Sequence, residues 1–208
     1  MIELHTVPTA NGYKVSIMLE ELHWPYEVVP YNLQKGEHLA PGYLSRNPVG
    51  RLPMLVDTDA ALREPLFLYG TMAILVYLAE KSQRFLPASQ PTRARVFEWL
   101  GIVSSDIAPA FTGQFVFNML MPEKIPAAIA FYDQLVTRLL APMELALGRS
   151  EYLAGPEYTI ADIIAYPVAA VSMQRFPGNF DRHPNIGRWA TLVGARPAVQ
   201  AGMRVPAA

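Results

Sequence analysis

The chain of 208 residues contains no cysteine, and this count limits its chemistry more than any other feature of the sequence. It excludes disulfide frameworks, cysteine-ligated zinc, Cys-x-x-Cys redox motifs and a cysteine nucleophile. The four histidines, His5, His23, His38 and His183, are scattered without the spacing of a metal site, so no metal is expected. Any thiol chemistry must therefore use a thiol that a ligand brings to the protein.

A second chemically distinct stretch is Thr159-Ile160-Ala161-Asp162, which has the spacing of a capping box. The Thr159 hydroxyl is expected to accept from the Asp162 amide, while the Asp162 carboxylate reaches back to the start of the helix. An almost wholly apolar helix, predicted over 160–173, follows this box and should lie at the buried centre of the second half. The function of the box is therefore structural.

The elements that must position these residues differ between the two halves of the chain. Up to about residue 81, short strands alternate with short helices in the order βαβ and then ββα, which predicts a small mixed sheet with helices on its faces. The expected strands are 1–5, 26–29, 53–56 and 66–69, and the expected helices are 13–22, a short one near 41–46, and 71–81. The stretch 8–12 is expected to be a loop.

Almost everything after a connector at 82–91, which contains two prolines, is predicted to be helical. A helix from Thr92 to Phe115 should be kinked at Pro109. Further helices are expected over 126–147, 160–173, 184–193 and 197–203. The predicted organisation is thus a first domain over 1–81, a linker over 82–91, and an all-helical domain over 92–208.

Composition excludes several classes of protein and of partner. With 51% hydrophobic and 17% charged residues the chain is not a disordered tail, and a net charge of −1 removes the basic patch of a nucleic-acid-binding protein. No apolar run approaches the roughly 18 residues of a membrane helix, so no membrane partner is expected. The N-terminus lacks the pattern of a secretory signal, which makes the cytoplasm the expected location.

Several motifs in a fixed order are more specific than the composition. They are Asn47-Pro48-x-Gly50-Arg51-Leu52-Pro53, the run from Met72 to Lys81, Thr159-x-x-Asp162, and the late Trp189 with Arg196-Pro197. Together with the two-part organisation, they resemble the cytosolic glutathione S-transferases over essentially the whole chain. The resemblance implies an α/β thioredoxin-like N-terminal domain plus an all-α C-terminal helical domain. Residues 11–17 and 35–38 look like Nu-type bacterial and fungal members, while 98–100 look more like the beta class.

In glutathione-dependent relatives the peptide thiol lies at the start of the first helix. Free amides and the helix dipole favour an anion there and lower the pKa of a bound thiol. From about 8.5, a shift of two units would leave mostly thiolate at neutral pH. The position of the beta-class cysteine holds Asn11, and Nu-type members use Thr and Asn in this loop. The resemblance therefore implies that the Asn11 amide and the Thr9 hydroxyl donate to the glutathione sulfur. The open alternative is that Asn11 only caps the helix and Thr9 only stabilises the turn.

The resemblance also implies where the rest of glutathione binds. A cis Leu52–Pro53 bond would turn the Leu52 backbone toward the cysteinyl unit. Arg51 and His38 would face the glycine carboxylate, although His38 is equally compatible with a solvated loop position.

At the γ-glutamyl end the chain departs from the family. Family members usually have an acid or amide followed by Ser, whereas this chain has Gly70-Thr71. Thr71 keeps a hydroxyl at a helix N-terminus, which suits a carboxylate. Gly70 has no side chain for the ammonium, and one lost charge-assisted hydrogen bond weakens binding by roughly 1.5–3 kcal/mol. Asp106, which resembles an acid that reaches across the dimer interface in several classes, would partly compensate, or it is an ordinary surface carboxylate.

A second, apolar pocket is expected between Asn11 and the kinked long helix. Its candidate walls are large groups that could equally be core residues: Phe111, Phe115, Phe117, Met119 and Met121.

The sequence thus predicts a homodimeric enzyme in which a bound glutathione thiolate attacks small apolar electrophiles or disulfides. Glutathione is a co-substrate in this prediction, and no metal is required. Two alternatives stay open. One is an isomerase like the maleylacetoacetate isomerases, which would need basic groups such as Arg138 or Arg175 in the second pocket. The other is a non-catalytic module that holds glutathione weakly.

Overall fold

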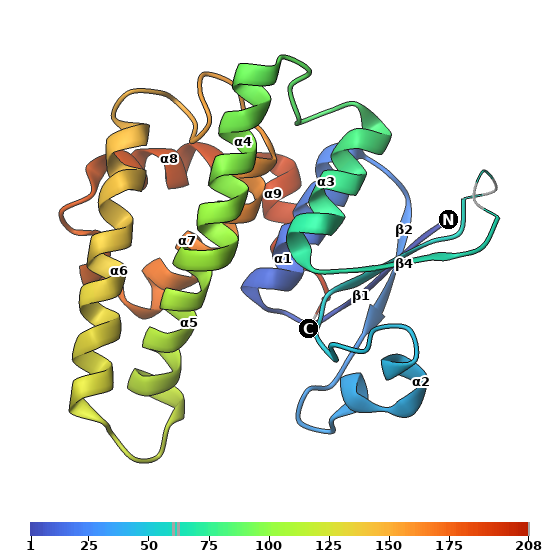
Figure 1. Ribbon diagram of the computed structural model, residues 1–208, viewed down its shortest axis with the longest axis horizontal. Coiled ribbons are helices and arrows are strands. Elements are labelled where there is room, and N and C mark those ends of the chain that lie inside the picture. The colour runs from blue at the N-terminus through green and yellow to red at the C-terminus, as the bar shows by residue number, and fades with distance from the viewer. Residues whose placement is uncertain (60, 62, 208) are drawn as a thin grey trace. The chain divides into compact units, whose positions relative to one another are not determined.

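The computed structural model describes residues 1–59, 61 and 63–207, and the chain divides into two compact units. The first unit comprises Met1–Arg84 together with the C-terminal segment that begins at Gly194, and the second comprises Phe85–Val193. Figure 1 labels the elements of both. The division differs from the all-helical domain predicted over 92–208, because packing groups the last helix with the α/β part.

A four-stranded mixed sheet forms the centre of the first unit. Its strands are β1 Ile2–Thr6, β2 Tyr26–Pro30, β3 Met54–Asp57 and β4 Leu66–Tyr69, in the order β2-β1-β3-β4. β1 pairs with β2 in parallel and with β3 antiparallel, and β3 pairs antiparallel with β4. The helical segments of this unit are α1 Ala10–Leu22, η1 Glu37–Leu39, α2 Pro41–Leu44, α3 Thr71–Ser82 and α9 Pro197–Gly202. The predicted mixed sheet is confirmed.

The two faces of the sheet follow the alternation of the strand residues. Met54 and Val56 of β3 pack against Tyr43 of α2. Leu55 of β3 and its partner Leu4 of β1 are fully buried on the opposite face, where α1 and α3 lie side by side (Figure 1). The residues of β3 thus alternate between the two faces, and the ends of β1 and β3 are held in a fixed register.

Helix α1 begins three residues earlier than the sequence pattern predicted. Thr9 is its N-cap, and the Thr9 hydroxyl oxygen accepts from the Gly12 amide at 3.3 Å. Gly12 passes so close to the preceding strand that an added Cβ would lie 2.3 Å from the Val7 carbonyl oxygen. Of the loop predicted over 8–12, residues 8–9 lie outside the helix as expected, whereas 10–12 already form the first turn of α1.

The C-terminal helix α9 packs against α1. The Ser16 hydroxyl donates to the Gly202 carbonyl at 2.6 Å, and an added Cβ on Gly202 would lie 2.6 Å from Ile17 Cα. Arg196 donates to both carboxylate oxygens of Glu21, at 2.6 and 2.9 Å. This bidentate ion pair and the close contact explain why the last residues of the chain belong to the first unit.

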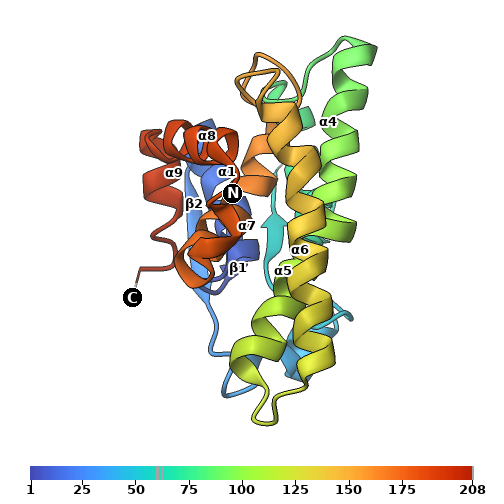
Figure 2. The same ribbon diagram turned by 90° about the vertical axis from the view of Figure 1, so that its left-hand side faces the viewer.

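All the named elements of the second unit are helical. Its segments are α4 Gln90–Ile102, η2 Val103–Ile107, α5 Ala108–Phe115, η3 Val116–Leu120, α6 Pro126–Leu147, α7 Ile160–Arg175, η4 Pro177–Phe180 and α8 Pro184–Gly194. Figure 2 shows α5 and α6 side by side. The predicted helical second part is confirmed. No helix among the described residues is long and apolar enough to cross a membrane.

The long helix predicted from Thr92 to Phe115 is present but begins at Gln90 and is interrupted by a π-helical segment. This segment, Val103–Ile107, ends two residues before Pro109. Proline has no amide hydrogen to donate, so the hydrogen-bond pattern changes before it. Farther along, Gly113 faces Tyr132 of α6, and an added Cβ would clash with that ring. The glycine thus lets α5 and α6 approach closely.

The predicted capping box is confirmed at the start of α7. The Asp162 carboxylate accepts from the Thr159 amide at 3.0 Å, and the Thr159 hydroxyl oxygen accepts from the Ala161 amide at 3.2 Å. Asp162 also accepts from the Leu153 amide at 3.0 Å and from Trp189 Nε1 at 2.9 Å. Burial raises the pKa of Asp162 to about 6, and these donors oppose that rise.

We expect Asp162→Ala to lower the free energy of unfolding by about 3 kcal/mol, because it removes a helix cap and leaves buried amide and indole donors unpaired. Urea denaturation followed by circular dichroism measures the change. Glu98→Ala is the control: Glu98 forms an exposed ion pair with Arg95 in the same unit, and its loss should change the free energy by less than about 1 kcal/mol. Equal effects of the two substitutions would contradict the structural role of Asp162.

Candidate functional site

A cavity of about 660 Å³ lies in the first unit, where the first turns of α1 and α3 meet the loop that precedes β3. It is lined by Val7, Thr9, Asn11, Leu33, His38, Gly50, Arg51, Leu52, Pro53, Gly70 and Thr71. Every predicted site residue except Asp106 is in this group. Sequence reasoning missed Val7 and Leu33, whose apolar side chains give no chemical signal.

Asp106 lies elsewhere, in η2 of the second unit. It is exposed, and its carboxylate accepts from the Ser105 hydroxyl at 2.7 Å. It does not line the cavity of the first unit. Its expected contact across a dimer interface concerns a second copy of the chain and stays a prediction.

The first turn of α1 presents two neutral polar side chains to the cavity. The Thr9 hydroxyl uses an oxygen lone pair for the cap, so its proton is still available to a ligand. Asn11 is exposed, and its Oδ1 accepts from Lys14 Nζ at 2.8 Å. Since Thr9 is the residue that caps the helix, the alternative in which Asn11 does so is wrong.

Lys14 is the least expected residue near the cavity. Its side chain is 1% exposed, and burial lowers its pKa to about 8. Among the residues that the structure describes, no carboxylate forms an ion pair with it. Sequence reasoning missed Lys14 because a charged residue in an amphipathic helix normally lies on the solvated face. The one available signal was its spacing of three from Asn11, which places both on one side of a helix.

The loop before β3 is held in place by the side chains of Tyr43 and Asn47. The Arg51 carbonyl oxygen accepts from the Tyr43 hydroxyl and from Asn47 Nδ2, both at 2.7 Å. Asn47 Nδ2 also donates to the Tyr43 hydroxyl oxygen at 3.1 Å. In a trans peptide the carbonyl and the following amide point in opposite directions. The Leu52 N–H therefore points away from Tyr43 and Asn47, and Leu52 is one of the residues that line the cavity.

The Leu52–Pro53 bond is cis, as the resemblance implied. Arg51 is exposed at the cavity and is its one guanidinium or ammonium group among the described lining residues. His38 also lines the cavity, and its Nδ1 is buried without a hydrogen-bond partner in the described part of the chain. Both residues thus lie where a ligand carboxylate could contact them.

The start of α3 forms another part of the wall. Gly70 occupies the N-cap position with φ of 86°, a conformation that favours glycine. Because glycine has no side chain, no side-chain hydrogen bond from the N-cap residue reaches the first amides of α3. With Thr71 as the first helical residue, this end suits an anionic group. The cavity therefore combines two helix N-termini with one cation and several neutral donors.

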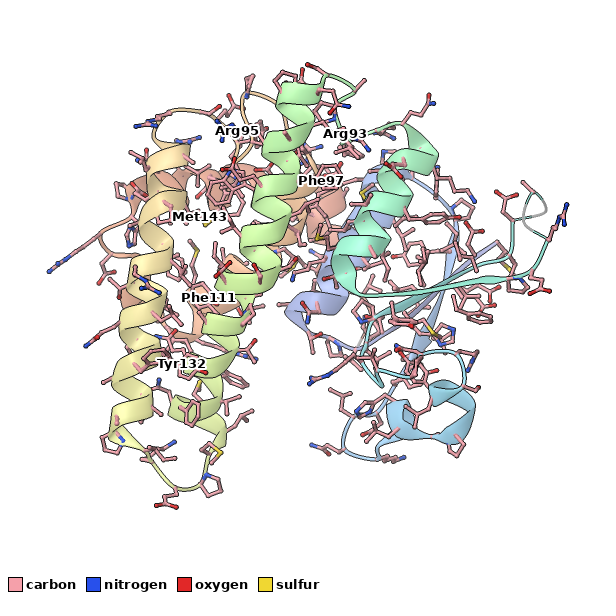
Figure 3. All side chains as sticks on the ribbon, in the orientation of Figure 1. Arg93, Arg95, Phe97, Phe111, Tyr132 and Met143 are labelled. Atoms are coloured by element: carbon pink, nitrogen blue, oxygen red, sulfur yellow. The ribbon has the colours of Figure 1, made fainter. Side chains whose placement is uncertain are left out.

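Two rings of the predicted apolar stripe, Phe111 and Phe117, stack on other rings of the second unit. Phe111 is 7% exposed and stacks on Phe180 with ring centroids 6.0 Å apart. Phe117 stacks on Tyr132 at 5.3 Å. Figure 3 shows Phe111 and Tyr132 where α5 and α6 face each other. These rings pack inside the second unit, and a second-substrate pocket that includes the stripe stays a prediction.

Family models match most of the chain. Residues 2–80 match the glutathione S-transferase N-terminal domain, and residues 109–197 match the glutathione S-transferase C-terminal domain. The disulfide-bond oxidoreductase YfcG of Escherichia coli (strain K12) is 35% identical, over 95% of this chain and 92% of its own. Glutathione S-transferase 3 of Zea mays is 30% identical, over 96% of this chain and 91% of its own.

Solved structures of glutathione transferases are also similar to this chain. A glutathione transferase from Burkholderia graminis with two glutathione molecules bound per subunit superposes with a TM-score of 0.94 at 30% identity, covering 99% of this chain and 88% of its own. A glutathione transferase from Pseudomonas putida with one glutathione disulfide bound per subunit has a TM-score of 0.94 at 30% identity, covering 99% and 91%.

The buried lysine predicts a pH-dependent difference in stability. Because the folded-state pKa of Lys14 is about 8 and the unfolded value is about 10.4, the unfolded chain binds more protons between these pH values. The wild type should therefore gain stability relative to Lys14→Met as pH rises from 8 to 10. Urea denaturation of both proteins at several pH values measures the gain. A constant difference would show that Lys14 titrates normally.

Proposed function

Because the chain belongs to the glutathione S-transferase family, we propose that it is a glutathione-dependent enzyme of the Nu type. Its bound glutathione thiolate attacks disulfides and, as a second reaction of the same sulfur, small apolar electrophiles. The observation that carries this proposal is the pair of neutral donors, Thr9 and Asn11, in the first turn of α1 beside the cavity.

These donors suit a thiolate for a physical reason. The amides at the N-terminus of α1 and the helix dipole favour negative charge, and hydrogen bonds to the charged form lower the pKa of a bound thiol. The Thr9 hydroxyl and the Asn11 amide nitrogen add two donors without introducing a group that competes as a nucleophile. Catalysis then comes from stabilising and positioning the sulfur, since the protein has no cysteine.

The remaining walls of the cavity match the other parts of the tripeptide. The Leu52 backbone pairs with the cysteinyl unit beside Pro53, because the clamped Arg51 carbonyl directs the Leu52 N–H toward the ligand. The γ-glutamyl carboxylate binds at the start of α3 with Thr71. The glycine carboxylate binds at Arg51 and His38, where the buried Nδ1 gains a partner if it is protonated.

The γ-glutamyl ammonium is the least satisfied group in this arrangement. Gly70 offers it no side chain, and nothing lies within 4 Å of where a Cβ would be. In a homodimer, Asp106 of the partner subunit would supply the missing carboxylate. Binding of a single glutathione is consequently expected to be weak, and binding of a larger disulfide ligand with more contacts is expected to be tighter.

Disulfide reduction without a protein cysteine requires two glutathione molecules. One thiolate attacks a substrate sulfur and expels the other half of the disulfide as a thiolate, which takes a proton. A second glutathione thiolate then attacks the glutathione sulfur of the mixed disulfide, which gives glutathione disulfide and a second free thiol. The related YfcG protein is named a disulfide-bond oxidoreductase, and related structures hold two glutathione molecules or one glutathione disulfide per subunit.

The other two interpretations make different demands. An isomerase needs basic groups such as Arg138 or Arg175 in the second pocket, and the guanidinium of Arg175 lies 4.0 Å from the centroid of the ring of Phe115, one of the candidate walls of that pocket. A non-catalytic module would bind glutathione weakly and reduce nothing. Calorimetry with reduced and oxidised glutathione separates these readings: tight binding of the oxidised form supports disulfide reduction, and no heat at millimolar ligand contradicts the proposal.

Asn11→Ala should lower kcat/KM for glutathione-dependent reduction of a small disulfide at least tenfold, because the thiolate loses a hydrogen-bond donor. Because the substitution also leaves the buried Lys14 ammonium without its described acceptor, the free energy of unfolding should fall by about 1–3 kcal/mol, although Thr9 still caps α1. Gln200→Ala, an exposed amide on α9, is the matched control. Wild-type rates of Asn11→Ala with both a disulfide and an aromatic chloride would refute the assignment of Asn11.

A further inference from the structure

We propose that Lys14 is a positioning residue of the thiolate site: its buried ammonium orients the Asn11 amide and places a positive charge behind it. This inference rests on the proposed function, because the group that benefits is the bound glutathione sulfur. It assigns a role to a residue that does not itself line the cavity.

The orientation follows from hydrogen-bond chemistry. An ammonium group donates and cannot accept, so only the oxygen of the Asn11 amide can face Lys14 Nζ, at 2.8 Å. The amide is planar, and Nδ2 therefore points to the other side. Because Asn11 is exposed and lines the cavity, this leaves an N–H donor for the ligand rather than a carbonyl oxygen. A carbonyl oxygen in that place would repel a thiolate.

The positive charge of Lys14 is expected to stabilise the bound thiolate in addition to orienting the Asn11 amide. Lys14 is 1% exposed, and among the described residues no carboxylate neutralises it. A buried charge interacts over several ångströms with little screening by solvent. Binding to the ammonium also polarises the Asn11 amide, which makes its N–H groups stronger donors. An anionic sulfur in the cavity is the counter-charge that the described residues do not provide.

The burial of Lys14 has no evident structural benefit. Lysine is almost never fully buried unless it is paired with an acid, and here the described partner is a neutral amide. A methionine at this position would fill the same space without a desolvation penalty. Groups that violate such a rule are concentrated at functional sites, where the loss of stability is tolerated.

Two substitutions separate the two effects. Lys14→Gln retains a side-chain N–H that can donate to Asn11 Oδ1, but it removes the charge. Lys14→Met removes both the donor and the charge. Lys124→Met is the matched control, since it changes net charge equally at an exposed site in the second unit. Circular dichroism and urea denaturation establish that each variant is folded.

The probes are two glutathione derivatives that differ in charge at sulfur. Glutathione sulfonate carries a fixed negative charge there, and S-methylglutathione is neutral. We expect the wild type and Lys124→Met to prefer the sulfonate, as measured by the ratio of dissociation constants in calorimetry. In both Lys14 variants this ratio should fall about tenfold, while the dissociation constant for S-methylglutathione stays within about twofold of the wild-type value.

Disulfide reduction gives an independent readout. We expect kcat/KM to fall in Lys14→Gln and to fall further in Lys14→Met, because only the latter frees the Asn11 amide to turn. Folded Lys14 variants that keep the wild-type preference for the sulfonate would overturn the inference. Equal losses of affinity for the sulfonate and for S-methylglutathione would overturn it too, since they would indicate that Lys14 has a purely structural role. A wild type that binds neither probe would instead refute the proposed function itself.

Discussion

The junction between β1 and α1 is the constraint on which the rest of the site depends. Gly12 passes the Val7 carbonyl at a distance that no side chain would permit, and Thr9 caps the helix at the same point. These contacts fix where the first amides of α1 point and bring Asn11 to the cavity. A chain without cysteine can stabilise a sulfur anion only with such fixed donors and dipoles, so small errors in this junction would remove the chemistry.

The second support of the cavity is independent of the first. Tyr43 and Asn47 hold the Arg51 carbonyl, and Tyr43 in turn packs on Met54 and Val56 of β3. The sheet core therefore sets the direction of the Leu52 amide. Since β1 and β3 are paired in fixed register, the two supports are held relative to each other by backbone hydrogen bonds. A ligand that contacts both α1 and Leu52 meets a preorganised surface.

Sequence reasoning could predict the elements, the capping box and most of the cavity lining, because periodicity and family motifs report them directly. It misplaced the start of α1, since Ala10 and Asn11 show no apolar periodicity and only the contacts of Thr9 and Gly12 reveal the first turn. It also placed the last helix with the helical part, because the contact between Gly202 and Ile17 joins residues far apart in sequence. Nothing in composition separates a buried Lys14 from a solvated one.

Asp162 and Lys14, two deeply buried charged groups of the described chain, show how the partners of such a group distinguish a structural role from a functional one. Asp162 accepts from the Thr159 and Leu153 amides and from Trp189, so its carboxylate is satisfied without any ligand. Lys14 has three protons to donate, and one neutral acceptor is described for it. A satisfied network specifies the fold, whereas an ammonium with unused donors next to a cavity lowers stability unless an anion arrives. The incomplete satisfaction of Lys14 is therefore the physical reason to connect it with ligand binding, and the complete satisfaction of Asp162 is the reason not to.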